Sequence, residues 1–348
     1  MGRRRSRRNK LVFVTVEVMA LFVVAAVAFG FFYAKNLWDK VETAGFDAAE
    51  VVTNVDLDQL GQKVSETYTT IAVFGIDARD KETLSKEALS DTNILVCINN
   101  DTKEIRLISI YRDFYVEDTK GDHSKLTEVY YQYGALEQIN TINKNLDLNV
   151  KQYVTVNWKA VADAVDLLGG LDISLTVQEA KGINRYVDEV IEATGISSGH
   201  IPSEEGVQHL DGVQTVTYCR LRNTAGSDYK RTERQREVLE LMLEKAKAAD
   251  VSQLAQICNT VFPGISTNLK LSDLVSMAGD TSRYTICDTA GFPFQKEDRS
   301  GGGKDYVYSL DLEEDVKELH SILYDDQEYT VSSTVKRLSK EMKDKFGD

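Results

Sequence analysis

The sequence predicts a mixed α/β protein: a three-layer α/β/α sandwich with a mixed central sheet, preceded by one N-terminal transmembrane helix. From about residue 69 onward, short and nearly continuous apolar runs alternate with amphipathic helical stretches, a pattern typical of strands covered by helices on both faces. Ahead of them, Leu11–Ala34 is an apolar run of 24 residues with a single charge, long enough to cross a bilayer. With 348 residues, 42% of them hydrophobic, the chain can bury a large core, and disorder as its dominant state is excluded.

The charges that flank the apolar run predict its orientation. Residues 1–10 hold six basic side chains and no acid, so we expect a cytoplasmic tail, a signal anchor over 11–34 and an extracytoplasmic remainder in a single-pass protein of the cell membrane. A cleavable signal peptide is the alternative, since Ala26-Val27-Ala28 fits a cleavage site, but the apolar run continues to Tyr33 and favours the anchor. Without residues 1–34 the chain carries a net charge of −19, which argues against non-specific binding of nucleic acid.

After a stalk of polar and apolar residues at 35–68, strand and helix signals follow one another. Three strands come first, at Thr70–Ile76, Thr92–Ile98 and Glu104–Ile110, and the turn residues 99–103 predict that the last two form a hairpin. Next come a helix at 125–146, a strand at Tyr153–Val156 and a helix at Trp158–Leu168 that ends at Gly169-Gly170. We then expect a strand at Leu171–Leu175, a helix at Gln178–Thr194, a strand at Val213–Arg222, a helix at Thr232–Ala249 and a charged, loosely ordered tail at 326–348.

The first candidate site is a cationic window, Arg220–Arg236, with six basic and two acidic residues in an acidic body. Strand alternation puts Arg220 and Arg222 on one face, roughly 7 Å apart, a spacing that suits a diphosphate or two carboxylates. In the following helix we expect Thr232 as the N-cap with Gln235 completing a capping box, which places the basic residues 231, 234 and 236 in or beside the first turn. Cations there oppose the helix dipole unless an anion binds. The alternatives are a solvated charged face, with Glu233 and Asp228 as partners, and a mere capping role for Gln235.

The second candidate site is formed by charged residues at strand ends. Asp77 follows the first strand, with Arg79 two residues on, Asp91 precedes the second, and Arg112-Asp113 ends the third. Strand ends along one sheet edge are where α/β proteins bind ligands, and two carboxylates facing a phosphate suit Mg²⁺. Aspartates that form turns or caps are the commoner explanation of such positions, and Lys125 is either a phosphate contact or a surface charge.

Several other kinds of site have no signal in the sequence. The four cysteines form no C-x-x-C pair: Cys97 and Cys219 are predicted core residues, and a disulfide between Cys258 and Cys287 is left open. The four histidines have no zinc-binding spacing, and there is no G-x-S-x-G motif.

Together these residues resemble the LytR-CpsA-Psr family of cell-envelope proteins over residues 69–325. The resemblance is carried by FGIDAR (74–79), SDT (90–92), SIYRD (109–113), KLTEVYYQYG (125–134), VNWKAVADAVDLLGGLDI (156–173), HLDG (209–212), YCRLR (218–222) and DYKRTERQR (228–236). It implies an extracytoplasmic catalytic domain with a hydrophobic tunnel for a polyprenyl chain. It also implies a phosphotransferase that moves an anionic glycopolymer, of teichoic acid or capsular polysaccharide type, from an undecaprenyl-diphosphate lipid to peptidoglycan, at the 6-hydroxyl of N-acetylmuramic acid.

The resemblance also implies roles for single residues. The catalytic residues would be Asp91, Arg112, Arg220 and Arg222. The diphosphate would be bound by Arg79, Lys125, Arg231, Arg234 and Gln235. Mg²⁺, or alternatively Mn²⁺, would be held by Asp77 and Asp91, which are also the candidate general bases, although a metal-bound carboxylate is a poor base. Asp228 would orient a basic neighbour.

The sequence departs from the family pattern at Tyr111, where proline is usual, at Lys230, where glycine is usual, and in a longer segment at 178–205. Three other functions stay open. One is a lipid-diphosphate hydrolase that uses the same residues, and another is an anchored, non-catalytic wall-binding or scaffold protein. The third, a transcriptional regulator, is disfavoured because residues 1–10 leave no room for a helix-turn-helix on the cytoplasmic side. The polymer and the oligomeric state are not predicted.

Overall fold

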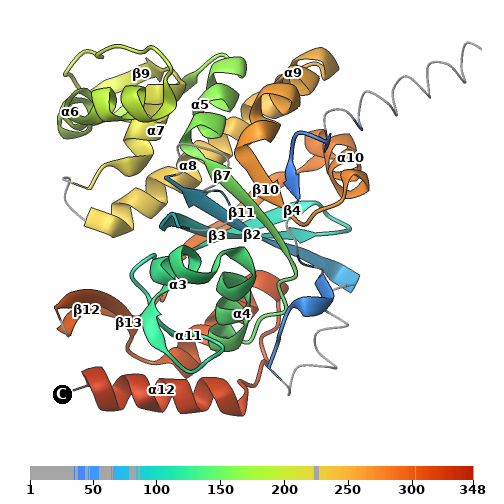
Figure 1. Cartoon of the computed structure of the whole chain (residues 1–348), viewed down its shortest axis with the longest axis vertical. Helices are drawn as coiled ribbons and strands as arrows, with labels where there is room; N and C mark the ends of the chain where they lie inside the picture. The colour runs from blue at the N-terminus through green and yellow to red at the C-terminus, as the bar shows by residue number, and fades with distance from the viewer. Residues whose placement is uncertain are drawn as a thin grey trace, which may run out of the picture.

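In the computed structural model, the central element is a mixed sheet of seven strands (Figure 1). The structure describes residues 35, 38–43, 46, 48–54, 64, 66–77, 84, 87–222, 227–301 and 303–347. The strand order is β1 (Glu42–Thr43), β10 (Ile265–Thr267), β7 (Gln152–Asn157), β2 (Tyr68–Ile76), β3 (Ser90–Asn99), β4 (Glu104–Ile110) and β11 (Thr285–Phe292). Strand β2 is parallel to β7 and antiparallel to β3, and β4 is antiparallel to β3 and parallel to β11. The predicted mixed α/β class with a mixed central sheet, including the β3–β4 hairpin, is confirmed.

Helices cover both faces of this sheet (Figure 1). One face carries α3 (Leu126–Tyr133), α4 (Ala135–Leu146), α11 (Leu312–Tyr324) and α12 (Ser333–Phe346). The other face carries α5 (Trp158–Leu167), α7 (Gly212–Arg220), α8 (Ser227–Ala248) and α9 (Val251–Val261), with α6 (Val177–Thr194) outside them. The largest apolar cluster lies on the first face, and smaller clusters lie on the second. The second face is therefore the less completely filled one.

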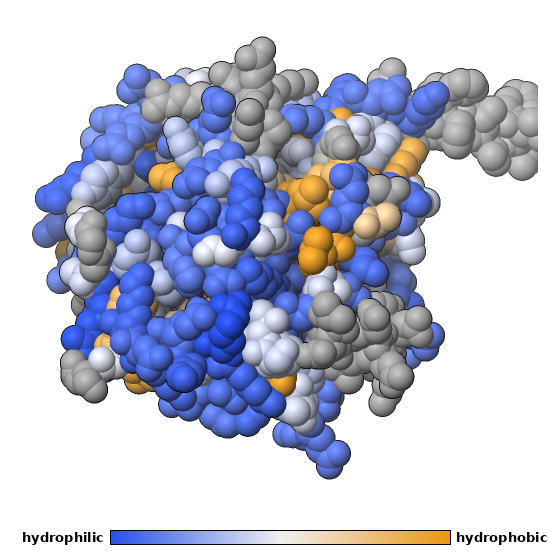
Figure 2. Space-filling view, turned by 60° about the horizontal axis from the view of Figure 1, so that its bottom comes forward, coloured by the Kyte–Doolittle hydropathy of each residue, from blue (hydrophilic) through white to orange (hydrophobic). Residues whose placement is uncertain are grey.

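Short elements complete the fold. The two-stranded sheets are β5 (Tyr115–Glu117) with β6 (His123–Lys125), β8 (Leu171–Leu175) with β9 (Gly206–Leu210), and β12 (Lys296–Gly301) with β13 (Lys304–Ser309). The remaining helices are α10 (Leu271–Gly279) and the 3₁₀ turns η1 (Ala48–Glu50), η3 (Phe262–Gly264) and η4 (Thr281–Arg283). Figure 2 shows one face of the molecule, which is largely hydrophilic with a few apolar residues, as expected for a chain of net charge −14.

The segment that the sequence predicts as a strand, 213–222, is helix α7. The helix begins at Asp211, whose side chain accepts a hydrogen bond from the Gln214 N–H in a capping box. Every residue from Gly212 to Tyr218 is buried, so this part of the helix has no exposed polar face, and its β-branched residues Val213, Thr215, Val216 and Thr217 favour a strand by propensity. The strand prediction was wrong because periodicity cannot separate a short buried helix from a buried strand.

Two helix boundaries also differ from the prediction. The helix predicted at 125–146 is interrupted at Gly134, whose φ of 81° is unfavourable for any residue with a Cβ, and becomes α3 and α4. Helix α8 begins at Ser227, five residues before the predicted N-cap. The Thr232 hydroxyl instead donates a hydrogen bond to the Tyr229 carbonyl inside the helix, so the predicted capping box with Gln235 is wrong.

Both ends of the described chain pack on the domain, beyond the predicted limits of 69 and 325. Strand β1 of the predicted stalk extends the sheet beside β10, and Phe46 stacks on Tyr153 with ring centroids 5.4 Å apart. The predicted loose tail is wrong for α12, because Val335, Leu338, Met342 and Phe346 form one apolar face that is buried in the core. No helix within the described residues has both the length and the apolar character needed to span a membrane, and the predicted anchor at 11–34 lies outside them.

Candidate functional site

Three strand ends bring the predicted acidic and basic residues to one edge of the sheet. Strand β2 ends there, the antiparallel β3 begins there, and β4 ends there, as the pairs Gly75↔Thr92 and Ile94↔Ser109 show. Asp77, Asp91 and Arg112 therefore leave the sheet at the same edge, as predicted. Helix α8 reaches this edge with its first turns, which carry Asp228 and Arg231.

These side chains form a connected ion-pair network. Arg112 Nη1 lies 2.7 Å from Asp91 Oδ1, and Arg112 Nε lies 3.4 Å from Asp113 and 3.7 Å from Asp228. Arg222 approaches Asp91 at 3.8 Å and Asp228 at 3.5 Å. Asp228 also pairs with Arg231 at 3.2 Å. Asp228 thus holds several guanidinium groups in place, which agrees with the orienting role that the resemblance implied.

Arg231 is the most deeply buried cation of the network. Its side chain is 2% exposed, and its Nη2 donates a hydrogen bond to the Asp91 backbone carbonyl at 3.2 Å. Its Nε and Nη1 donate no hydrogen bond within the described residues, and neither does Arg112 Nε. Burial lowers the pKa of Arg231, although Asp228 and Asp91 act against this. Buried guanidinium donors with unused capacity suit an anionic ligand with several acceptor oxygens, such as a phosphate.

Arg220 lies on the other side of the same opening. It is the last residue of α7, and its guanidinium carbon lies 3.8 Å from the ring centroid of Trp158, the first residue of α5. Its Nη1 is 4.0 Å from Glu189. Burial lowers the pKa of Arg220, and the charges of Asp77, Glu189 and Asp91 partly offset this, which places those carboxylates within electrostatic reach.

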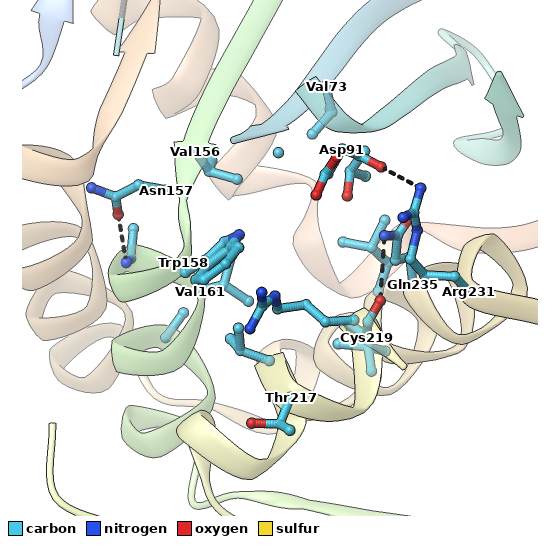
Figure 3. A pocket seen from close by; sticks show the side chains of 18 of the residues that line it. Val73, Asp91, Val156, Asn157, Trp158, Val161, Thr217, Cys219, Arg231 and Gln235 are labelled. Atoms are coloured by element: carbon cyan, nitrogen blue, oxygen red, sulfur yellow. Dashed lines mark hydrogen bonds between the residues drawn. The ribbon is translucent and has the colours of Figure 1, made fainter. Parts of the chain in front are cut away.

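An apolar cavity of about 480 Å³ opens beside these charges (Figure 3). It lies between the sheet and the helices α5, α7 and α8. Its walls are mostly apolar and include Val73, Val156, Val161, Val216, Val238, Leu239, Met242 and Val261. Figure 3 shows Asp91, Arg231 and Gln235 on one side of the cavity and Trp158 and Val161 on the other. An apolar chamber with a cationic mouth fits an amphipathic molecule with an anionic head.

The structure brings most of the predicted site residues together. Asp91, Arg220, Arg222, Arg231 and Gln235 line the cavity, and Arg112 contacts Asp91 directly. The Gln235 amide donates to the Cys219 carbonyl at 3.5 Å. Arg220 and Arg222 do not lie side by side on a strand, because α7 ends between them and each faces its own partners. Arg79 lies outside the described residues.

Two predicted phosphate contacts are engaged elsewhere. Lys125 Nζ pairs with Asp113 at 2.9 Å, and Asp113 in turn contacts Arg112. Arg234 Nε pairs with Glu179 at 2.9 Å, and its Nη1 donates to the Leu221 carbonyl, so it ties α8 to α6 and to the end of α7. Neither residue lines the cavity. We interpret both as residues that support the network in this structure.

Sequence reasoning missed Trp158 and Glu189, which flank Arg220. Trp158 follows a predicted strand end, a place where ligand-binding residues gather, so its position was a usable signal. Glu189 sits within a helix with no motif around it, and only the packing of α6 against α7 brings it near.

Two carboxylates at the mouth, Asp77 and Asp91, match the donor type that Mg²⁺ prefers. Asp91 already shares its oxygens with Arg112 and Arg222, so a cation there would depend on Asp77, phosphate oxygens and water for most of its ligands. Within the described residues, a second acidic cluster consists of Glu117, His123 and Glu341. Glu117 there is already paired with Arg337 and Lys144, which leaves little negative charge for a metal.

Comparison with known proteins gives a consistent result. The sequence profile of the LytR_cpsA_psr family matches residues 37–320. The polyisoprenyl-teichoic acid–peptidoglycan teichoic acid transferase TagT of Bacillus subtilis (strain 168) is 29% identical over 282 residues, 79% of this chain and 84% of that protein. TagU of Enterococcus faecalis, which carries the same transferase name, is 26% identical over 79% of this chain and 84% of that protein.

Solved structures share the fold. The crystal structure of protein gbs0355 from Streptococcus agalactiae matches with a TM-score of 0.64 at 23% identity, over 78% of this chain and 94% of that one. The crystal structure of TagT from B. subtilis matches with a TM-score of 0.57 at 24% identity, over 81% and 99% respectively.

Proposed function

Because this chain belongs to the LytR-CpsA-Psr family, we propose that it is a phosphotransferase that moves an anionic glycopolymer from a polyprenyl-diphosphate carrier to peptidoglycan. The curated relatives named above are teichoic acid transferases, and one solved TagT structure holds an octaprenyl pyrophosphate lipid. The polymer would be of teichoic acid or capsular polysaccharide type, and the acceptor would be the 6-hydroxyl of N-acetylmuramic acid.

The proposal rests on one observation: the apolar cavity opens directly beside the buried guanidinium groups. A polyprenyl chain would occupy the space lined by α5, α7 and α8, and its diphosphate would reach Arg231, Arg220 and Arg222. The incompletely satisfied guanidinium of Arg231 is the strongest sign. Its Nε has no acceptor within the described residues and its Nη1 has only the ion pair with Asp228, and such a buried donor is costly unless a ligand supplies the missing acceptor.

The reaction would be an in-line phosphoryl transfer. The acceptor hydroxyl attacks the sugar-side phosphorus, a new P–O bond forms, the bond to the bridging oxygen breaks, and the lipid phosphate leaves. Such a step depends mostly on positioning and on charge stabilisation, which the arginines at the mouth would provide. Asp77 and Asp91 are the candidates for taking the hydroxyl proton, and Arg112 already occupies one oxygen of Asp91.

We propose Mg²⁺ as the cofactor, with Mn²⁺ as the alternative. Asp77 and Asp91 would hold it beside the diphosphate, where it would neutralise phosphate charge. The rest of the charge stabilisation would come from Arg112, Arg220 and Arg222 of this chain. Residues 11–34 would anchor the protein in the cell membrane, so that the site faces the outer leaflet and the wall.

The test uses the full chain in vesicles with a synthetic polyprenyl-diphosphate oligosaccharide and peptidoglycan fragments, with Mg²⁺ or with EDTA. Mass spectrometry would detect a phosphodiester-linked product. We expect this product to require the metal and to disappear in Asp91→Ala and Arg220→Ala, while Arg185→Ala, an exposed arginine on α6, keeps it. Release of the phosphorylated sugar without linkage would point to a hydrolase. Lipid binding without turnover would point to a binding or scaffold protein, and linkage that persists in EDTA would remove the metal from the scheme.

A further inference from the structure

Helix α10 is an apolar helix that the fold covers only in part: Leu271, Leu274 and Met277 are half-buried, and Val275 and Ala278 are exposed. Five of its nine residues are aliphatic or methionine, yet none of its side chains is buried. Val275 is 57% exposed, the highest value for a large apolar side chain in any helix within the described residues. By contrast, the amphipathic helix α11 buries seven residues. An apolar helix that keeps part of its apolar surface exposed marks a contact surface.

The neighbourhood of α10 is also only partly covered. The turn η3 has no buried residue, although it begins with Phe262 and Pro263. Strand β10 then runs along the edge strand β1, and its continuation leads into α10. Figure 1 shows α10 beside β1 and β10, at the end of the molecule away from α6 and β9.

The predicted membrane anchor ends at this same place. Trp38 packs edge-on against Phe262 with ring centroids 6.4 Å apart, and Lys40 hydrogen-bonds Asn259 of α9. The apolar run ends at Ala34, and four residues of chain span at most about 14 Å. A bilayer that holds the anchor must therefore approach η3 and β1 closely, which brings it to the uncovered side of α10.

The charges around α10 suit a membrane surface. Lys270 is exposed at the N-cap of α10, Lys35 is exposed three residues before Trp38, and Asp280 is paired with Lys103 and Arg283. The Asp273 carboxylate accepts the Lys270 N–H in a capping arrangement, so its charge lies at the start of the helix and not among the apolar residues. A short helix with apolar residues on one side and lysines at its edge is typical of segments that lie in the bilayer interface.

We propose that α10, together with η3, lies in the outer surface of the lipid bilayer and forms a second membrane contact beside the anchor. The contact would fix the orientation of the domain on the membrane. Val261, at the end of α9, lines the cavity, and the ring of the next residue, Phe262, contacts the ring of Trp38. The apolar end of the cavity would thus face the bilayer. The inference rests on the anchored topology of the proposed function, and its test does not depend on transfer activity.

The experiment measures the membrane depth of single spin labels in the full chain. Cys219, Cys258 and Cys287 would first be replaced by serine. Cys97 stays, because it is fully buried and burial raises the pKa of its thiol to about 12. A label is then placed at Val275→Cys, and a matched label at Val207→Cys on β9, where the native valine is also exposed. The chain is reconstituted in vesicles of phosphatidylglycerol and phosphatidylethanolamine, and flotation checks that it is bound.

We expect the label at 275 to relax mainly by collision with dissolved oxygen and the label at 207 mainly by collision with a water-soluble nickel chelate. Equal accessibility of both labels to the nickel chelate in floating vesicles would overturn the inference and leave the anchor and the proposed transfer untouched. A chain that does not float would contradict the anchor and the inference together. A lipid-facing label in a chain without transfer activity would support the inference and count against the proposed function alone.

A second variant tests the consequence for function. Val275→Glu puts a charge on the bilayer side of α10, where it is unfavourable. We expect several-fold slower transfer from a long-chain donor in vesicles and no change with a short-chain, water-soluble donor. Equal rates for the variant and the parent with the long-chain donor would contradict an orienting role for this contact.

Discussion

Arg112 Nη1 lies 2.7 Å from Asp91 Oδ1, and this ion pair ties the end of β4 to the start of β3 at the mouth of the cavity. The backbone carbonyl of Asp91 also accepts a hydrogen bond from Arg231. Asp91 therefore contacts Arg112, which we propose as a catalytic residue, through its side chain, and Arg231, which we assign to the diphosphate, through its main chain. Arg112 keeps Asp113 and Asp228 as further partners, so the network does not depend on Asp91 for its stability.

The first prediction follows from this arrangement. Asp91→Asn should lower kcat/KM for transfer by about 100-fold or more, the usual effect of removing one preorganised electrostatic group. The melting temperature should change little, because the Asp91 side chain is partly exposed and Arg112 stays paired. Product formation by mass spectrometry and thermal unfolding would be measured together, with Asp188→Asn, an exposed residue on α6, as the matched control. Full activity of Asp91→Asn would remove this carboxylate from the reaction.

The second prediction concerns Arg231, for which stability and binding should change in opposite directions. Arg231 is a buried charge near two other guanidinium groups, and its partner Asp228 keeps Arg112 and Arg222 when Arg231 is removed, so the substitution leaves no carboxylate unpaired. Arg231→Met should therefore keep or raise the melting temperature. It should weaken binding of a polyprenyl diphosphate by about 10- to 100-fold, since a hydrogen bond to a charged group contributes about 1.5–3 kcal/mol.

Calorimetric binding and thermal unfolding would be compared with those of Arg185→Met. A large loss of stability with unchanged binding would show that Arg231 is a structural residue, and it would leave the unused donors of its guanidinium without an explanation.

Much of this site was predictable because it depends on local topology. Strands β2, β3 and β4 are consecutive and β3–β4 is a hairpin, so their ends had to meet at one edge. That alone brought Asp91 and Arg112 together. The carboxylate that we propose as catalytic and its nearest cation thus follow from strand positions that the sequence predicts.

The remaining part of the site depends on contacts between helices that are distant in the sequence. Such contacts do not affect the hydrophobic periodicity of either helix. Helix α7 is buried from Gly212 to Tyr218 and is rich in β-branched residues, so it was predicted as a strand and Arg220 was expected beside Arg222. Its position against Trp158 arises only when α5 and α7 pack together. The apolar cavity has the same origin, because its lining comes from the sheet and from several helices at once.

The third prediction tests the cavity as the site of the lipid chain. Val161→Phe adds bulk to an apolar wall, where Figure 3 shows the valine opposite the charged residues. We expect binding of a long polyprenyl diphosphate to weaken by about tenfold, equivalent to about 1.4 kcal/mol, with little effect on a short-chain diphosphate. The ratio of the two affinities is the measurement. Val177→Phe, a partly exposed valine on α6 outside the cavity, is the control. An unchanged ratio in Val161→Phe would place the lipid chain elsewhere.

The fourth prediction concerns the docking of α12, which the sequence did not predict. Glu117 of β5 receives two hydrogen bonds from Arg337 of α12, both 2.8 Å long, and pairs with Lys144 of α4 at 2.6 Å. Burial alone would raise the pKa of Glu117, but these hydrogen bonds outweigh it and lower the pKa to about 2. A carboxylate with a depressed pKa stabilises the fold above its unfolded-state pKa and loses this effect as the pH falls.

The parent should therefore lose stability between about pH 4.5 and pH 2, the window in which Glu117 is protonated in the unfolded chain but still charged in the fold. Glu117→Gln removes the charge at every pH, so it should be less stable than the parent at pH 7. We expect a difference of about 2 kcal/mol, less than the whole pKa difference implies because water screens the pair.

The difference in stability between Glu117→Gln and the parent should shrink as the pH falls from about 4.5 to about 2. Urea unfolding at pH 7 and pH 3 measures it, with Glu313→Gln, at an acidic position in the first turn of α11, as the control. A constant difference between Glu117→Gln and the parent at both pH values would show that charge pairing does not hold α12 against the core. The apolar face of α12 would then account for its docking.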